Sequence, residues 1–395
     1  MKPTKLNLHL SLLQAEQYET SRYLAGRNQI NPEIVKRMRM TGRLKLTRVL
    51  SYLVGIVGAN ILISLIVNVY EKMVWNSVKS KIAHLKSKGL KVVAIAGSYG
   101  KTSVKHYTYE LLRHKYRTVA TPESFNTVLG IAKCLEYEVD EKTEIFIVEM
   151  GAYHIGDITH LLTMVNPDIG ILTGMARQHL ERFGSWENIQ QAKSEIAVFM
   201  KEIGGILVAN GSDEYVVQNV EKLGVKPLWY RGKDRHEINM DGAKKVVESM
   251  GVTEIAIKKI KVREPKNRFE MTTKRYGMKV IDDSFSSNDK GFANAVTYLG
   301  KQTKYTRILV TPGLVELGSE SNVIHVELGK GIVGNADYVM LVGKNERTAN
   351  LEKGMSGQVK TIYLNKTLDF MQAVKDLKLK KEPLVLIEND VTENY

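Results

Sequence analysis

Short apolar runs, several of them ending in glycine, alternate with helical patterns along most of the chain. Three runs fall at Val92–Ala96, Ile145–Gly151 and Ile169–Gly174, and two more at Arg307–Val310 and Tyr338–Gly343. Apolar runs of this length are typical of strands buried on both faces of a parallel sheet, with the helices as crossovers. The pattern predicts an α/β fold: a central domain with a mostly parallel sheet and a smaller Rossmann-like α/β domain, with ligands at the carboxyl ends of the strands.

The first 88 residues follow a different pattern, that of a helical, hydrophobic and basic segment. Val49–Tyr70 has no charged residue over its length, so as a helix it is long enough to cross a hydrocarbon core of about 30 Å. It follows a long basic stretch and no small-residue cleavage site comes after it, so it lacks the form of a cleavable signal peptide. Asn60, Ser64 and Asn68 recur every four residues, which predicts a polar stripe on one helix face.

Charge is concentrated on both sides of this uncharged stretch. The whole chain carries a net charge of +14, of which residues 1–48 contribute +7 and residues 71–91 contribute +5. The remaining body is nearly neutral, so the charge indicates an anionic membrane surface as partner and no nucleic acid. Three interpretations of Val49–Tyr70 stay open: a single transmembrane span, an in-plane or re-entrant helix on an anionic leaflet, and a buried helix of a soluble protein. The first two place the protein at the cytoplasmic face of a bacterial cell membrane.

Composition gives the size and number of domains. The 395 residues are 43% hydrophobic and 25% charged with 8 prolines, which is typical of a folded chain of two or three domains. The single cysteine, Cys134, excludes an internal disulfide and suits a reducing compartment. We place boundaries after residue 88 and at the charged, proline-containing segment Val262–Lys266, which predicts domains at 1–88, 89–262 and 263–395.

A glycine loop follows the first apolar run. Gly97 and Gly100 precede Lys101 and Thr102, and a helical pattern follows, so the order is strand, glycine loop, helix. Backbone N–H groups of such a loop can hold a polyphosphate, the lysine can reach its oxygens, and the threonine hydroxyl can bind Mg²⁺. The match is to a short G-x-x-G-K-T form, and a glycine turn that happens to precede a lysine is the alternative.

Two further polar residues stand at the ends of predicted strands. Glu149 ends the second run, where a carboxylate can hold a phosphate-bridging metal, and His179 follows the third. Taken singly, a solvated glutamate and a hydrogen-bonded core histidine are the more usual roles of such residues. Their order along the chain carries more weight than either residue alone.

An ordered set of motifs resembles the Mur ligase family, and most of all its member that adds D-alanyl-D-alanine to a UDP-muramoyl-tripeptide. The resemblance covers about residues 90–345. The motifs that carry it are Gly97–Ser103, Thr121–Thr127, Val148–Ala152 with Gly156, Asn166–Asp168, His179–Glu181 with Phe183–Gly184, Gln191–Ile196, Asn267–Glu270, Val280–Asn288 and Gly313–Gly318.

The resemblance implies a role for each matching residue. It implies that Lys101 contacts the β/γ phosphates of ATP, that Thr102 and Glu149 bind one Mg²⁺, and that His179 binds a second. It further implies that Lys193 is carbamylated by CO₂ to become an anionic metal ligand, and that Arg268 closes over the phosphates from the last domain. The catalytic set implied is Lys101, His179, Lys193 and Arg268. The nucleotide set implied is Gly97, Ser98, Tyr99, Gly100, Lys101, Thr102, Ser103, Asn126, Arg268, Asp283 and Asn288.

The activity implied is ATP-dependent, ADP-forming amide ligation through an acyl phosphate, in peptidoglycan precursor synthesis. The partners implied are a small-molecule or lipid-linked wall precursor and an amino acid or dipeptide. Residues 1–88 are too few, too basic and too apolar to form the UDP-sugar-binding domain of standard relatives. The same chemistry on a capsular or poly-γ-glutamate-type polymer, and a non-catalytic nucleotide-binding membrane scaffold, are therefore the alternatives. Glu316 and His325 fall in the region where the incoming amine is expected.

Overall fold

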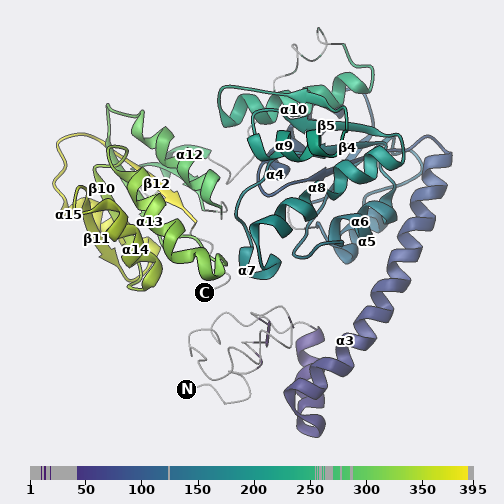
Figure 1. Ribbon diagram of the computed structural model, residues 1–395, viewed down its shortest axis with the longest axis horizontal. Helices are drawn as coiled ribbons and strands as arrows, with labels where there is room; N and C mark the ends of the chain where they lie inside the picture. Colours follow the sequence, from purple (N-terminus) through teal and green to yellow (C-terminus); the bar gives the residue numbers. More distant parts are fainter. Residues whose placement is uncertain are drawn as a thin grey trace. The chain divides into compact units, whose positions relative to one another are not determined.

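The structure of the chain is a computed structural model. It describes residues 10, 13, 14, 18, 42–122, 125–253, 255, 257, 260, 262, 270–275, 278–284 and 288–389. The chain divides into two compact units, Met1–Ser77 with Val391–Tyr395, and Val78–Asp390, and the larger one holds both sheets (Figure 1).

The first sheet of the larger unit has six strands in the order β2-β3-β1-β4-β5-β6, and all neighbouring strands are parallel. Its strands are β1 (Lys91–Ala96), β2 (Thr118–Ala120), β3 (Ile145–Glu149), β4 (Ile169–Leu172), β5 (Ile206–Asn210) and β6 (Leu228–Tyr230). Its helices are α4 (Lys101–Leu112), α5 (Val128–Tyr137), α6 (Asp157–Val165), α7 (Leu180–Phe183), α8 (Trp186–Glu202), α9 (Glu214–Lys222) and α10 (Arg235–Ser249). β1 is apolar and buried from Val92 to Ala96 and β3 from Ile145 to Val148, as expected of interior strands of the sheet.

Helices cover both faces of this sheet. The core on one side joins β1 and β3 to α4 and α10 through residues such as Ile95, Leu111 and Val246. On the other side α8 packs on β4, and a Cβ added at Gly170 would lie 2.6 Å from the Met200 side chain, so the helix lies directly against the strand. The two layers leave the carboxyl ends of β1, β3 and β4 open to a common site.

The second sheet also has six strands, in the order β11-β10-β9-β12-β8-β7, with all neighbours parallel except β7 and β8. Its strands are β7 (Glu270–Arg275), β8 (Met278–Asp283), β9 (Thr306–Thr311), β10 (Tyr338–Val342), β11 (Lys360–Leu364) and β12 (Pro383–Glu388). Its helices are α12 (Asp289–Gly300), α13 (Ser321–Ile332), α14 (Glu346–Met355) and α15 (Phe370–Asp376), with short 3₁₀ turns at Gly318–Glu320 and Thr367–Asp369.

The second sheet is likewise covered on both faces. One apolar cluster packs α12, α13 and α14 against residues such as Leu309 and Leu341, and another packs α15 on the opposite face through Phe370. The predicted fold class, two α/β units with mostly parallel sheets after a helical apolar segment, is confirmed. The boundaries at residues 88 and 262 stay predictions.

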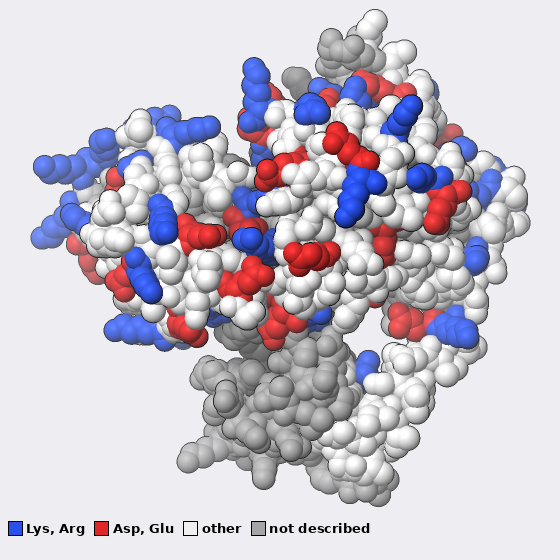
Figure 2. All heavy atoms as spheres, viewed as in Figure 1, with Lys and Arg blue, Asp and Glu red and all other residues white. Residues whose placement is uncertain are grey.

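The helix α3 (Gly42–Ser87) contains the uncharged stretch Val49–Tyr70. Its backbone is non-helical at Gly55, where φ is 72° and ψ is 168°, so the stretch is two helical arms joined at a kink. Among the described residues, Val54–Ser87 is long and apolar enough to cross a membrane, and 17% of its most apolar window is buried. Figure 2 shows the acidic and basic side chains of the rest of the chain interspersed on the face in view.

The contact between α13 and α14 gives a test of the fold. A Cβ added at Gly329 would lie 2.2 Å from the Leu351 carbonyl oxygen and 2.9 Å from the Gly354 Cα. We expect Gly329→Ala to force the two helices apart and to lower the free energy of unfolding by about 1–3 kcal/mol. The measurement is differential scanning calorimetry of the full chain.

Gly331 supplies the matched control on the same helix. A Cβ added there meets nothing within 4 Å, and alanine is the better helix former, so Gly331→Ala should leave stability unchanged or raise it by up to about 1 kcal/mol. If both variants lost the same free energy of unfolding, the close contact between α13 and α14 would not be the reason for glycine at position 329.

Candidate functional site

The loop between β1 and α4 has a backbone that only glycine tolerates well. Gly97 has a φ of 147° and Gly100 a φ of 82°, in the range that side chains disfavour. A Cβ at Gly97 would also lie 2.2 Å from the Thr173 Oγ1. That hydroxyl donates to the loop, with the Tyr99 carbonyl oxygen at 2.5 Å and the Ala96 carbonyl oxygen at 3.1 Å. The end of β4 therefore holds the loop in shape.

The first residues of α4 point their polar groups at the same space. In α4 the first-turn N–H groups have no partner within the helix, and they carry the positive end of its dipole. The Lys101 Nζ folds back to donate to the carbonyl oxygens of Gly97 (2.8 Å) and Ser98 (3.3 Å). This loop concentrates positive charge before any ligand is considered.

Glu149 ends β3 beside the loop and is almost completely buried. Its Oε2 lies 3.2 Å from the Thr102 Oγ1 and 2.9 Å from the Lys105 Nζ, and both members of the Glu149–Lys105 ion pair are over 90% buried. The Thr121 hydroxyl accepts a hydrogen bond from the Glu149 N–H at 3.2 Å, which fixes the end of the strand. The carboxylate is thus held where Thr102 can share a metal with it.

His179 stands at the start of α7 with a φ of 56°, so its backbone is in the left-handed region. Its ring meets the Tyr153 ring edge-on, with centroids 4.9 Å apart. Its Nδ1 is hydrogen-bonded to Glu316, which also accepts from the Arg182 Nε and Nη2, each at 3.0 Å. Burial acts to raise the pKa of Glu316, but the bonds from His179 and Arg182 outweigh it and lower the pKa to about 2.

Lys193 lies on the buried side of α8. Its side chain is 4% exposed, its Nζ lies 3.5 Å from the Ala152 carbonyl oxygen, and the same Nζ lies 5.1 Å from the centre of the Phe183 ring. Burial, followed by the nearby positive charge of Lys101, lowers the pKa of Lys193 to about 7. Near neutral pH a large share of this amine is therefore uncharged and nucleophilic.

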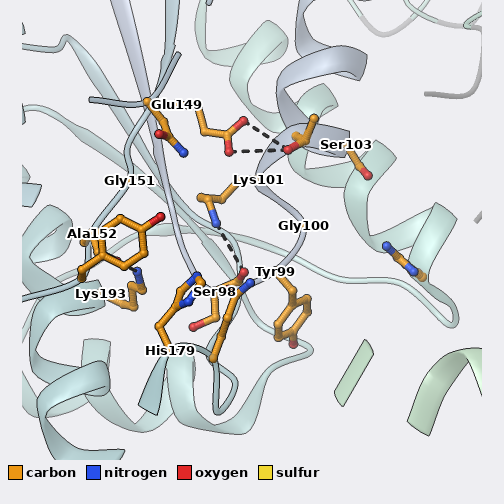
Figure 3. A pocket seen from close by; sticks show the side chains of 15 residues that line it. Ser98, Tyr99, Gly100, Lys101, Ser103, Glu149, Gly151, Ala152, His179 and Lys193 are labelled. Carbon is orange, nitrogen blue, oxygen red and sulfur yellow. Dashed lines mark hydrogen bonds between the residues drawn. The ribbon is translucent and has the colours of Figure 1, made fainter. Parts of the chain in front are cut away.

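These residues line a single pocket, shown in Figure 3. Its lining comes from the loop and the start of α4, from Asn126, from the segments after β3 and β4, from the middle of α8 and from the start of α10. The lining residues are Ser98, Tyr99, Gly100, Lys101, Thr102, Ser103, Asn126, Glu149, Gly151, Ala152, Tyr153, Gln178, His179, Lys193 and Arg235. The structure thus brings together the predicted loop residues with Asn126, Glu149, His179 and Lys193, although the roles assigned to them stay predictions.

The predicted residues of the second sheet lie elsewhere. Asp283 is fully buried at the end of β8, where its Oδ2 accepts from the Arg235 Nη1 at 2.9 Å. Asn288 caps α12 by accepting from the Gly291 N–H at 2.7 Å. Neither lines the pocket, and Arg268 lies outside the described residues. His325 is fully buried and accepts from the Leu314 N–H at 3.0 Å, so it supports a turn.

The site fits a polyphosphate with a divalent metal, as the predicted ligand set requires. Among the residues described, the buried Ser98 hydroxyl in the loop has no hydrogen-bond partner. No three His, Cys, Asp or Glu side chains of the described part of the chain converge as a ready-made metal site. The candidate donors are instead a hydroxyl, a carboxylate and an imidazole, so oxygen atoms of a bound phosphate would have to complete the coordination.

The sequence interpretation missed four residues at this site. Lys105 pairs with Glu149, Arg235 pairs with Asp283, Tyr153 packs on His179, and Glu316 binds His179. The sequence predicts Glu316 in the region of the incoming amine, whereas the structure sets it against His179. The one available signal was helical spacing for Lys105, four residues after Lys101 on the same helix face. The others come from segments far apart in the chain, which one sequence does not pair.

Comparison with known proteins gives concordant matches. The model of the Mur ligase middle domain matches residues 95–282, and that of the Mur ligase glutamate ligase domain matches residues 267–387. The UDP-N-acetylmuramoyl-tripeptide–D-alanyl-D-alanine ligase of Escherichia coli K12 is 27% identical over 307 residues, 67% of this chain and 67% of that protein.

Solved structures share the fold. A crystal structure of MurF from Acinetobacter baumannii aligns with a TM-score of 0.70 at 20% identity, covering 81% of this chain and 78% of that one. MurF ligase from Thermotoga maritima in complex with ADP aligns with a TM-score of 0.68 at 23% identity, covering 81% and 80%. At these identities the likeness establishes the arrangement of both sheets.

The lowered pKa of Lys193 predicts a pH-dependent cost in stability. Below about pH 7 the folded chain must keep the buried amine charged. Between about pH 7 and the ordinary value of 10.5 only the unfolded chain binds that proton, so stability rises with pH in this window. We expect the free energy of unfolding of Lys193→Met to exceed that of the native chain. This difference should shrink by about 2–3 kcal/mol from pH 7 to pH 9, because the native chain gains stability over that range. Thermal unfolding in CO₂-depleted buffers measures it.

Lys201 is the control on the same helix. It is exposed and donates to the Leu223 carbonyl oxygen at 2.8 Å. Lys201→Met should show no pH-dependent margin in this window. A margin for Lys193→Met that stays constant from pH 6 to pH 9 would mean that the Lys193 amine keeps an ordinary pKa.

Proposed function

Because the chain belongs to the Mur ligase family of ATP-dependent ligases, we propose that it joins an amino acid or dipeptide to a carboxylate in peptidoglycan precursor synthesis, with release of ADP. One observation carries the proposal. The phosphate loop, the buried carboxylate of Glu149 and the buried amine of Lys193 face one pocket at the carboxyl ends of parallel strands.

The chemistry demands control of charge. A carboxylate must approach the γ-phosphate of ATP, and an amine must then displace phosphate from the acyl phosphate, so several anionic oxygens meet at one place. In the proposed mechanism Lys101 and the N–H groups at the start of α4 hold the phosphates. Thr102 and Glu149 hold one Mg²⁺, and His179 holds a second. Bound Mg²⁺ supplies positive charge that offsets the repulsion between these oxygens.

Lys193 is proposed to complete the second metal site as a carbamate. Its neutral amine attacks the carbon of CO₂, an N–C bond forms, and the nitrogen loses a proton to water. The product is an anionic oxygen ligand where a lysine alone would repel the metal. The buried position of the side chain and the pKa of about 7 support the step, because an amine that is charged near neutral pH is not a nucleophile.

The C-terminal residues are proposed to act on the nucleotide from the second sheet. Arg268 would bind phosphate through its two-pronged guanidinium, and Asp283 would take the ribose hydroxyls in exchange for Arg235. Asn126 and Asn288 are weaker candidates for contacts to the nucleotide. Asn288 already caps α12. Domain closure would exclude water from the acyl phosphate.

The relatives' names indicate the substrates to test. The Escherichia coli relative is named for UDP-N-acetylmuramoyl-tripeptide and D-alanyl-D-alanine, and we propose these, or a lipid-linked form of the first, as substrates. We further propose that the ligase domains are cytoplasmic and that α3 binds an anionic membrane surface. The support is the exposed apolar stretch with net charges of +7 before it and +5 after it.

The ligase proposal predicts a product of defined mass. Purified full-length protein is incubated with Mg-ATP, bicarbonate, UDP-N-acetylmuramoyl-tripeptide and D-alanyl-D-alanine, while ADP and product mass are followed together. We expect ADP and the pentapeptide precursor in equal amounts. Lys101→Ala should reduce the rate by at least about 100-fold, because it removes the cation nearest the phosphates.

Lys115 is the control for the loss of a lysine, since it is exposed on the turn after α4 and outside the pocket. Lys115→Ala should keep the native rate. ADP release that needs both an amine and a carboxylate but yields another product would move the activity to another acceptor, such as a capsular polymer. No ADP with any pair would contradict the ligase and favour the scaffold.

Glu316 is predicted to act as a positioning residue for His179. Its carboxylate fixes which ring nitrogen of His179 faces the pocket, as second-layer carboxylates do for metal-binding histidines. We expect Glu316→Gln to lower kcat by about 10–100-fold and to raise the Mg²⁺ concentration needed for half-maximal rate, with little change in KM for ATP.

Glu320 is the matched control in the same segment. It is 41% exposed by side chain and pairs with Arg177 at 3.5 Å, away from His179. Glu320→Gln should leave the Mg²⁺ requirement unchanged. If Glu316→Gln raised KM for ATP without altering the Mg²⁺ requirement, the contact with His179 would serve only to hold the two sheets together.

A further inference from the structure

The two arms of α3 fold back on each other. The Arg43 Nη2 donates to the Ser64 Oγ at 2.9 Å and to the Asn60 Oδ1 at 3.4 Å. In an unbroken helix, Arg43 and Ser64 would lie about 32 Å apart at 1.5 Å per residue. The backbone at Gly55, with its positive φ, reverses the chain between them. Residues 42–54 and 56–73 therefore form an antiparallel helical hairpin. We call this the α3 hairpin.

The inner side of the α3 hairpin is unusually polar. Thr47 is 0% exposed and Asn60 is 1% exposed, and the Asn60 Nδ2 donates to the Tyr18 carbonyl oxygen at 2.8 Å. The Arg43 guanidinium also lies 4.0 Å from the centre of the Tyr18 ring. Of the polar stripe predicted from Asn60, Ser64 and Asn68, the first two meet Arg43 of the other arm, whereas Asn68 is exposed. Leu44, Ala59 and Ile63 are also buried.

The outer side of the α3 hairpin is apolar and exposed. Its exposed large apolar residues are Leu46, Val49, Val54, Ile61, Leu62, Leu65, Ile66, Val69, Tyr70 and Met73, each between 45% and 66% exposed. In Figure 2 the corresponding part of α3 is largely free of charged side chains. A hairpin folded for water buries its large apolar residues and exposes its polar ones. This hairpin instead exposes ten large apolar residues and buries Thr47 and Asn60 on its inner side, which is how helices pack in lipid.

We infer that the α3 hairpin enters the membrane from one side as a re-entrant element, so that the N-terminus and the ligase domains lie on the same, cytoplasmic side. From Gly55 to Tyr70 the second arm is about 22 Å long at 1.5 Å per residue, which is short of a hydrocarbon core of about 30 Å. Glu71 marks the interface on the second arm, and the Arg43 guanidinium, bound to Ser64, lies about 10 Å deeper at 1.5 Å per residue. A lipid bilayer keeps the inner hydrogen bonds out of water.

Charge on the flanks identifies the kind of surface. The segments before and after the apolar stretch, residues 1–48 and 71–91, carry net charges of +7 and +5. In a hairpin both segments meet one leaflet, and an anionic one attracts each. In a single span the +7 segment would have to cross the membrane, against the usual retention of basic segments in the cytoplasm. A second copy of the chain would bring like charges together.

The inference rests on the membrane part of the proposed function, and labelling from one side of the membrane separates the two. Cys134 is buried, so the native thiol does not compete for a membrane-impermeant maleimide. Thr4→Cys and Ser80→Cys place single reporters before and after the α3 hairpin in the full chain. We expect both to be labelled in inside-out vesicles from expressing bacteria, and neither in intact spheroplasts.

Two other patterns would overturn the inference. Thr4→Cys labelled only in spheroplasts would show a single span and would leave the membrane proposal intact. Protein that stays in the supernatant when the vesicles sediment would overturn both the re-entrant hairpin and the proposed membrane binding of α3. This is the result expected if a second copy of the chain covers the apolar side.

A second variant tests which side of the hairpin meets lipid. Leu65 is 59% exposed on the outer side, and Leu65→Lys should weaken flotation of the full chain with vesicles of 70% phosphatidylcholine and 30% phosphatidylglycerol by about tenfold or more. Val323, 63% exposed in the second sheet's α13, is the control, and Val323→Lys should float as the native chain does. Unchanged flotation for Leu65→Lys would overturn the assignment of the outer side to lipid.

Discussion

Positive charge gathered around one pocket is the constraint on which the rest of the site depends. Lys101 and Lys193 line it, while Lys105 is paired with Glu149 at 2.9 Å, so this carboxylate offsets only part of the positive charge. The amines of Lys101 and Lys193 are held by backbone carbonyl oxygens. Repulsion between them is reduced because the pKa of Lys193 falls to about 7. A pocket built in this way is stabilised by an anion of high charge. Such an excess of positive charge suits the polyphosphate that we propose as its ligand.

The sheet explains why these groups meet. The carboxyl ends of β1, β3 and β4 lie side by side in the register Ile95 to Glu149 and Ala96 to Leu172. The polar residues that follow each strand must therefore emerge at the same edge. Thr173 extends this arrangement by binding the loop after β1 from the end of β4, so the shape of the phosphate loop depends on a neighbouring strand.

The sequence predicts those parts of the structure that local patterns encode. Buried strands such as β1 and β3 are continuous apolar runs, and glycine at positions 97 and 100 is required by the backbone itself. Contacts between distant segments carry no local pattern. Arg235 with Asp283, and Glu316 with His179, join residues 48 and 137 positions apart, so one sequence does not pair them. The kink at Gly55 was missed for a related reason, since a glycine in an apolar helix is usually tolerated.

Two contacts across the larger unit show how its second sheet bears on the pocket. Glu316 meets His179 and Arg182 through both oxygens, and Asp283 meets Arg235, which itself lines the pocket. Burial, followed by the nearby Asp283 carboxylate, raises the pKa of Glu388 well above its usual value. Each contact sets an acidic group of the second sheet on a residue that lines the pocket. The Arg235–Asp283 pair thus joins the lining of the pocket to the end of β8 in the second sheet.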